Sequence, residues 1–128
     1  MKANTNKCIR VYADKDQINR CKNEIDSLDE SFLSISNALS LAGNNVRLKI
    51  LYLLQKESKM CPCDLSDILG MTVPAISQHL KKMREAQLIY QNKVGQTVFY
   101  SINEKHKDLL TPLFQLIQIS NKESTSKE

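Results

Sequence analysis

Hydrophobic residues recur at helical spacing through the middle of the chain. The first predicted helix has its inward face on Phe32, Ile35, Leu39 and Ala42. It would end at Gly43, and Asn44 or Asn45 can cap the helix that follows. That second helix carries an apolar stripe formed by Val46, Ile50, Leu53 and Leu54. Leu48 and Leu51 lie off the stripe, which indicates burial on more than one side.

Two further helices of unequal length are predicted next. The shorter covers residues 64–69, ends at Gly70 and faces inward with Leu65, Ile68 and Leu69. Thr72 can cap the longer one, and Pro74 is tolerated in its first turn because that N–H has no intrahelical partner. Its buried stripe is formed by Val73, Ile76, Leu80 and Met83. Two helices joined by such a short turn predict a helix-turn-helix.

Strand-forming residues follow between Leu88 and Ile102, on both sides of the turn-forming stretch NKVGQ. They predict a two-stranded hairpin with Lys93 near its tip. Residues 104–119 have a helical pattern, but Pro112 predicts a kink or a break there. The whole order is typical of a winged helix-turn-helix, a mainly α fold with a β-hairpin wing. The alternative is a generic small α+β domain with no role in nucleic-acid binding.

The outward face of the fourth helix carries side chains suited to DNA recognition. It presents Ser77, Gln78, Lys81 and Lys82, with His79 at its edge. Donors and acceptors of these kinds read base edges and phosphates in a major groove, whereas a merely solvated face is more often rich in Glu–Lys pairs. Lys93 is predicted to contact phosphate. The net charge of +4 allows an anionic partner but does not require one.

The two ends of the chain are polar. We predict an amino-terminal arm over 1–27, in which Ile18 and Ile25 can support a short helix, a winged-helix domain over 28–119 and a disordered tail over 120–128. No apolar run is long enough for a signal peptide or a membrane span, so we expect a cytoplasmic protein without membrane contacts. Four cysteines in that reducing compartment indicate metal or redox chemistry more than disulfides.

Two of these cysteines, Cys61 and Cys63, stand at the start of the third helix on either side of Pro62. Proline restricts the backbone there, and a bent entry segment can turn two sulfur atoms toward one ion. A helix N-terminus favours the thiolate, the form that binds metal or is oxidised. The alternative is that the cysteines are small buried hydrophobic residues. Soft-metal sites take three or four ligands, and Cys8 and Cys21 are the only other cysteines.

The stretch MCPCDLSDILGMTVPAISQHLKKMREAQLI and the hairpin GQTVFYSI resemble the ArsR/SmtB metal-sensing repressors, especially the CadC-like branch. The resemblance covers about residues 7 to 110. It implies a homodimer that binds double-stranded operator DNA and releases it when metal binds. Cys61 and Cys63 match the family's helix-entry pair, and Cys8 matches the first cysteine of its arm. The second arm position is Tyr12 here, so Cys21 would have to substitute from a different place.

Two other family sites are incomplete in this sequence. Arsenic sensors have a third cysteine where this chain has Ser66. The family's zinc site on the last helix is matched by Glu104 and His106 in its first half, but its second half falls near Ile117 and Ser120, which are poor zinc ligands. We therefore expect that zinc site to be absent and His106 to be an ordinary surface residue.

The metal effector is predicted to be a soft divalent ion, Cd, Pb, Hg or Zn, because thiolates disfavour hard ions. One alternative keeps the DNA-binding role and makes the cysteines a thiol redox switch. Another is a metal-buffering or structural zinc module that does not bind DNA. An enzyme is not expected, because the sequence has no Cys-x-x-Cys, no glycine-rich phosphate motif and only two histidines.

Overall fold

The structure is a computed structural model that describes the backbone of residues 8–126 and the side chains of residues 8–117. The chain divides into two compact units, with the boundary between Ser34 and Ile35. The first unit contains α2 (Lys15–Ser27) and the beginning of α3 (Asp29–Ala42). Asp14 caps α2 by accepting a hydrogen bond from the Gln17 amide at 3.0 Å. The short helix expected around Ile18 and Ile25 is therefore present, while the predicted domain limits stay a prediction.

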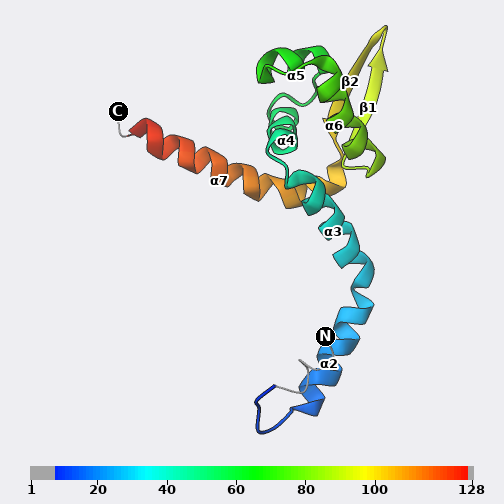
Figure 1. The fold of residues 1–128 in the computed structure, drawn as a ribbon, viewed down its shortest axis with the longest axis vertical. Helices are drawn as coiled ribbons and strands as arrows, with labels where there is room; N and C mark the ends of the chain where they lie inside the picture. Colours follow the sequence, from blue (N-terminus) through cyan, green and yellow to red (C-terminus); the bar gives the residue numbers. More distant parts are fainter. Residues whose placement is uncertain (1–7, 127–128) are drawn as a thin grey trace. The chain divides into compact units, whose positions relative to one another are not determined.

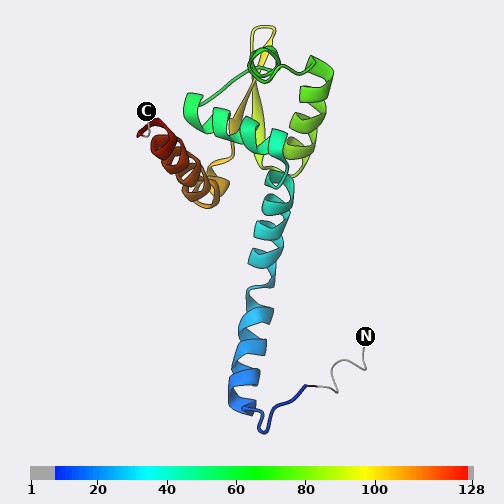
Figure 2. The same cartoon turned by 60° about the vertical axis from the view of Figure 1, so that its left-hand side comes forward.

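The second unit contains the rest of α3 and the elements of the predicted winged helix-turn-helix (Figure 1). They are, in chain order, α4 (Asn45–Glu57), α5 (Pro62–Leu69), α6 (Val73–Glu85), β1 (Ile89–Val94), β2 (Thr97–Ile102), η1 (Glu104–His106) and α7 (Lys107–Ser126). Helix α5 packs on α6, α6 on β1, and α4 on β2 (Figure 1, Figure 2). This arrangement confirms the predicted fold class.

The hairpin pairs β1 and β2 in antiparallel register from Ile89↔Ile102 to Val94↔Thr97. Gly95 opens its two-residue turn at φ 63°, a conformation that glycine adopts without strain. Lys93 lies one residue before the last pair, close to the tip as predicted. We call this hairpin the wing.

The core of the second unit is formed by side chains from every one of its helices and strands. Its fully buried members are Ile50, Leu51, Leu54, Leu65, Ile76, Leu80, Met83, Leu88, Ile89 and Leu110. Each stabilises the fold by about 1.5–3 kcal/mol through burial. Leu51 is among them, which confirms that α4 is buried on more than one side. No helix in the described part of the chain is long and apolar enough to cross a membrane.

The predicted inward face of α3 is wrong for most of its length. Phe32, Ile35 and Leu39 are about half exposed, at 51%, 47% and 45%, whereas Ala42, the fourth predicted residue, is buried, as is Ala38. Ala38 and Ala42 are buried in the core and Leu41 packs against it, so α3 contacts the core at its carboxyl-terminal end. The periodicity detects an apolar face but not which surface covers it. Ile68 and Val73, also predicted to face inward, are exposed for the same reason.

The predicted break at Pro112 is also wrong, because α7 is continuous from Lys107 to Ser126. Proline removes one hydrogen bond, the one to the Asp108 carbonyl. Leu110 and Phe114, one on each side of Pro112, are buried in the core. Their packing holds the helix together across the proline. Helical backbone therefore continues to Ser126, into the segment for which disorder was predicted, and residues 127–128 lie outside the described residues.

Candidate nucleic-acid interface and thiol pair

Helix α6 is built to display one polar face, and we call it the recognition helix. Thr72 caps it by accepting from the Ala75 amide at 3.3 Å, and Pro74 occupies its first turn. Ile76, Leu80 and Met83 fix it to the core with their side chains fully buried. The side chains predicted to read DNA on the opposite face, Ser77, Gln78, Lys81 and Lys82, are all exposed.

His79, the fifth residue predicted on this face, is held by another helix. It is half-buried, and its Nδ1 accepts a hydrogen bond from Arg47 Nε at 3.2 Å. Burial lowers the pKa of His79 below its usual 6.5, and the charges of Arg47 and Lys82 lower it further. The imidazole is therefore neutral near pH 7, and its proton is on Nε2, because Nδ1 is the acceptor.

Arg47 is a residue that the sequence analysis missed. Its Nη1 also donates to the Leu41 carbonyl at 3.3 Å, and its amide donates to the Asn44 side chain that caps α4. One guanidinium thus joins the end of α3 and the start of α4 to the recognition helix. Arg47 and His79 are 32 residues apart, so no local pattern could have paired them.

The wing presents its own charged side chains. Lys93 is exposed on β1, in keeping with the predicted phosphate contact, which stays a prediction. Next to Val98, the strand partner of Lys93, Phe99 has Lys59 over its ring, with Nζ 4.7 Å from the ring centroid.

Cys61 and Cys63, which we call the thiol pair, lie at the start of α5 as predicted. Cys61 is the N-cap residue in an extended conformation, and its amide donates to Asp64 Oδ2 at 3.4 Å. Pro62 follows as the first helical residue. Cys61 is partly exposed and Cys63 is exposed, and both are free thiols. Their exposure argues against the alternative that they are simply buried hydrophobic residues.

The thiol pair fits half of a soft-metal site. Two thiols beside the positive end of a helix supply the ligand chemistry that such ions prefer, but three or four ligands are needed. Cys8 and Cys21 are exposed in the first unit, and Cys21 shares one face of α2 with Ile18 and Ile25. Within the described part of each unit, no three His, Cys, Asp or Glu side chains form a metal cluster. A soft-metal site built on the thiol pair would need further ligands from another segment or a second chain.

Ser66 and Tyr12 stand at positions where the family resemblance implies cysteines. The Ser66 hydroxyl donates to the Met71 carbonyl and fastens the turn between α5 and α6. Tyr12 is 88% exposed. Ser66 therefore has a structural role in the helix-turn-helix.

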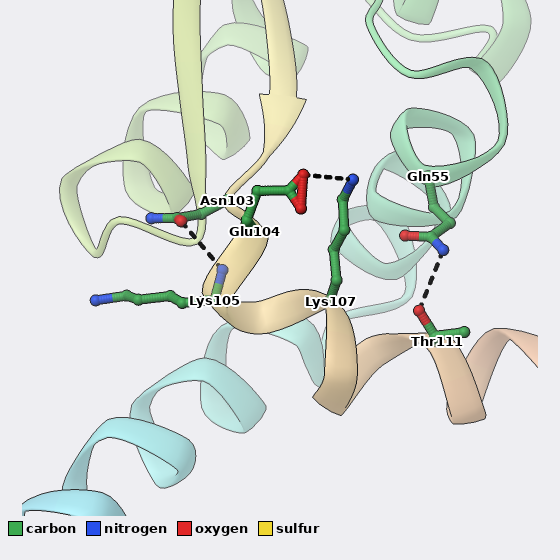
Figure 3. Close-up of polar contacts among 6 residues, drawn as sticks. All are labelled: Gln55, Asn103, Glu104, Lys105, Lys107 and Thr111. Atoms are coloured by element: carbon green, nitrogen blue, oxygen red, sulfur yellow. Dashed lines mark hydrogen bonds and ion pairs between the residues drawn. The ribbon is translucent and has the colours of Figure 1, made fainter.

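Glu104 and His106, which match the first half of the family's zinc site, belong to no metal cluster among the described side chains. Glu104 pairs with Lys107, its carboxylate oxygen 3.0 Å from Nζ (Figure 3). His106 is buried at 7% exposure, so its assignment as an ordinary surface residue is wrong. Burial and the charge of Lys105 lower its pKa. A histidine at the 3₁₀ turn before α7 is packed against the core, which sequence spacing does not reveal. The Ser120 side chain lies outside the described residues.

The recognition helix, its preceding helix and the wing define a winged helix-turn-helix DNA-binding regulator. The bacterial regulatory protein arsR family matches residues 44–91. Two relatives are a CadC homolog of Staphylococcus aureus, a cadmium resistance transcriptional regulatory protein (26% identity, 84% of this chain and 88% of that protein), and CadC of Listeria innocua (30%, 69% and 72%). The solved homodimeric winged helix-turn-helix DNA-binding domain of Mycobacterium bovis Mb0332 is similar in fold, with TM-score 0.59 and 20% identity over 79% of this chain and 91% of that one.

The chain belongs to the ArsR/SmtB family of transcriptional repressors. This is a family of DNA-binding regulators and not of enzymes. The resemblance inferred from the sequence is thereby confirmed.

Proposed function

We propose that this protein is a metal-responsive repressor that binds operator DNA as a homodimer and is released by a soft divalent ion, Cd, Pb, Hg or Zn, bound to cysteine thiolates. The observation that carries the proposal is the pair of free, accessible thiols at the start of α5, the helix that packs on the recognition helix. Two relatives whose names refer to cadmium resistance support a metal effector.

The thiol pair forms the indispensable half of the site, and Cys8 and Cys21 complete it. Both of these are exposed and free, on a unit that has no buried side chain in α2. Three or four thiolates match soft ions, whereas Mg²⁺ and Ca²⁺ require oxygen ligands. Metal binding by Cys8 and Cys21 would also stabilise the polar amino-terminal arm.

A second copy of the chain accounts for the apolar face of α3. Ile35 and Leu39 stay about half exposed in one chain, and Leu116 on α7 is 61% exposed. Rows of exposed apolar side chains mark interaction surfaces, and a dimer would cover them. Two recognition helices related by a twofold axis can then enter successive major grooves, about 34 Å apart.

Metal controls DNA binding by linkage. If the metal-bound dimer spaces its recognition helices differently, metal and DNA oppose each other with a coupling of about 1–3 kcal/mol, or roughly 5–150-fold in operator affinity. The second candidate is a thiol redox switch on the same pair, which the exposure of Cys63 favours. A metal-free protein whose DNA binding responds only to oxidation would identify that switch.

The deciding experiment is a gel shift on DNA from the promoter of the protein's own gene, with and without Cd(II). Cys61→Ser and Cys63→Ser should still bind DNA but no longer release it, because serine keeps the size and removes the soft sulfur. Asp67→Asn, an exposed change on the same helix, is the matched control and should behave as wild type. Thiolate-to-metal absorption should report three or four sulfurs per metal, and one fewer in Cys61→Ser. Normal release by both serine variants would disprove thiolate sensing.

A further inference from the structure

The segment between α4 and α5 joins the thiol pair directly to the wing. Helix α4 ends at Glu57 with Ser58 as its C-cap, and Lys59 and Met60 lead into Cys61. Met60 pairs with Tyr100 of β2 in an antiparallel bridge. The Met60 amide donates to the Tyr100 carbonyl at 3.2 Å, and the Tyr100 amide donates back to the Met60 carbonyl at 2.9 Å. Met60 thus adds a third, one-residue segment to the pairing of β1 and β2.

A side-chain contact beside this bridge strengthens the same connection. The Lys59 ammonium lies over the Phe99 ring, next to Tyr100 in β2. Lys59 and Met60 therefore contact Phe99 and Tyr100, one pair through side chains and the other through the backbone. Such paired contacts transmit a displacement better than a single hydrogen bond, because a shift of one strand carries its neighbour along.

The start of the segment has an unusual backbone. Ser58 has φ 74° and ψ −42°, a region that residues with a side chain rarely adopt. Such a conformation persists when the surrounding structure imposes it. The segment is thus held at one end by α4 and at the other by the wing, with Cys61 next in the chain.

The other strand of the wing carries Lys93, the side chain predicted to contact phosphate. In the hairpin, Tyr100 pairs with Gln91, and Lys93 pairs with Val98 two residues farther toward the tip. A movement of Met60 therefore reaches Lys93 through one strand pairing.

We propose that the Met60–Tyr100 bridge transmits metal binding at Cys61 to the wing, so that the wing takes part in DNA release. This inference rests on the proposed function and assigns it a route. Closing a thiolate shell around an ion repositions the Cys61 backbone, the adjoining Met60 moves with it, and β2 follows through the two hydrogen bonds.

The test compares the full-length wild type with Met60→Pro, which removes the amide donor of the bridge. Cd(II) titration by thiolate absorption measures metal affinity, and binding to the promoter DNA with and without Cd(II) measures release. Met60→Pro should bind Cd(II) within about twofold of wild type. Its release should fall from the roughly 5–150-fold of a coupled system to below about threefold.

Two further measurements keep the inference testable if Met60→Pro does not fold. In the wild type, Cd(II) should shift the amide resonances of Val98 and Tyr100. Lys59→Ala should reduce release by about twofold at unchanged metal affinity, while Lys56→Ala, which removes the same charge from an exposed position on α4, should not. Unmoved wing resonances, or full release by a folded Met60→Pro variant, would overturn the route and leave the proposed function standing. A wild type that binds none of Cd(II), Pb(II), Hg(II) and Zn(II) would overturn both.

Discussion

We predict that the hydrogen bond from Arg47 to His79 stabilises the position of the recognition helix. The perturbation is a double-mutant cycle with Arg47→Met, His79→Ala and the double variant. Methionine keeps the length and apolar stem of arginine but cannot donate to His79 Nδ1 or to the Leu41 carbonyl. The cycle isolates the Arg47–His79 interaction from the other bonds that each residue makes.

The expected coupling follows from the geometry. A hydrogen bond to a charged group contributes about 1.5–3 kcal/mol when it is buried. This bond is 3.2 Å long and only partly buried, so solvent weakens it. We therefore expect a coupling of about 1 kcal/mol near pH 8, with Arg47→Met alone costing about 1–3 kcal/mol because it loses a second bond as well.

The pH dependence has a definite sign. The pKa of His79 is lowered in the folded protein, so the unfolded chain binds a proton more readily below pH 6.5. The stability that neutral His79 provides is complete above 6.5 and is lost as pH falls through the lower, folded pKa. The coupling to Arg47 should vanish over the same window, since protonated Nδ1 no longer accepts a hydrogen bond.

Urea unfolding at fixed protomer concentration, at about pH 8 and about pH 5, measures the cycle. His106 also has a lowered pKa, but it is present in all four proteins, so its contribution cancels. In Arg47→Met, the pKa of His79 should rise but stay below 6.5, because burial is the larger cause. A coupling below about 0.3 kcal/mol at the higher pH, or one that does not change with pH, would refute the assigned link.

Two further predictions concern DNA contacts and assembly. Lys93→Ala should weaken binding to promoter and unrelated DNA equally and reduce the slope of log affinity against log salt concentration by about one. Gln78→Ala should weaken only the promoter complex, by about 1–3 kcal/mol. A changed sequence preference in Lys93→Ala would show that the wing reads bases. Leu39→Asp should raise the dimer dissociation constant at least about tenfold by light scattering, because it places a charge in an apolar interface. Ser40→Asp, at an exposed neighbouring position, is its control, and equal dimerisation of both variants would exclude this face of α3.

The helix-turn-helix could be predicted because its signals are local. Thr72 caps the recognition helix as its position suggested, Gly70 ends α5 at φ 67°, and Ile76, Leu80 and Met83 are buried at helical spacing. These features depend on a few neighbouring residues and on backbone preferences that any context shares.

The features that sequence could not predict depend on distant partners. The hydrogen bond from Arg47 to His79 joins residues 32 positions apart in the chain, and His106 is buried only in the folded protein. The apolar row of α3 was recognised but assigned to the wrong surface, since periodicity does not distinguish a core from an interface. The helix continues through Pro112 because the tertiary packing of Leu110 and Phe114 outweighs the helix-breaking effect of proline.

The position of the thiol pair explains why one ion could act on both DNA-contacting elements. After Cys61 and Cys63, α5 runs only to Leu69, and the hydrogen bond from Ser66 to the Met71 carbonyl ties its end to the turn before Thr72. On the other side of the pair, Met60, the residue directly before Cys61, forms the backbone bridge to the wing. A displacement at Cys61 therefore has a short covalent and hydrogen-bonded path in each direction. Neither path crosses the polar face of α6. The affinity for DNA could therefore change without a rearrangement of the side chains on that face.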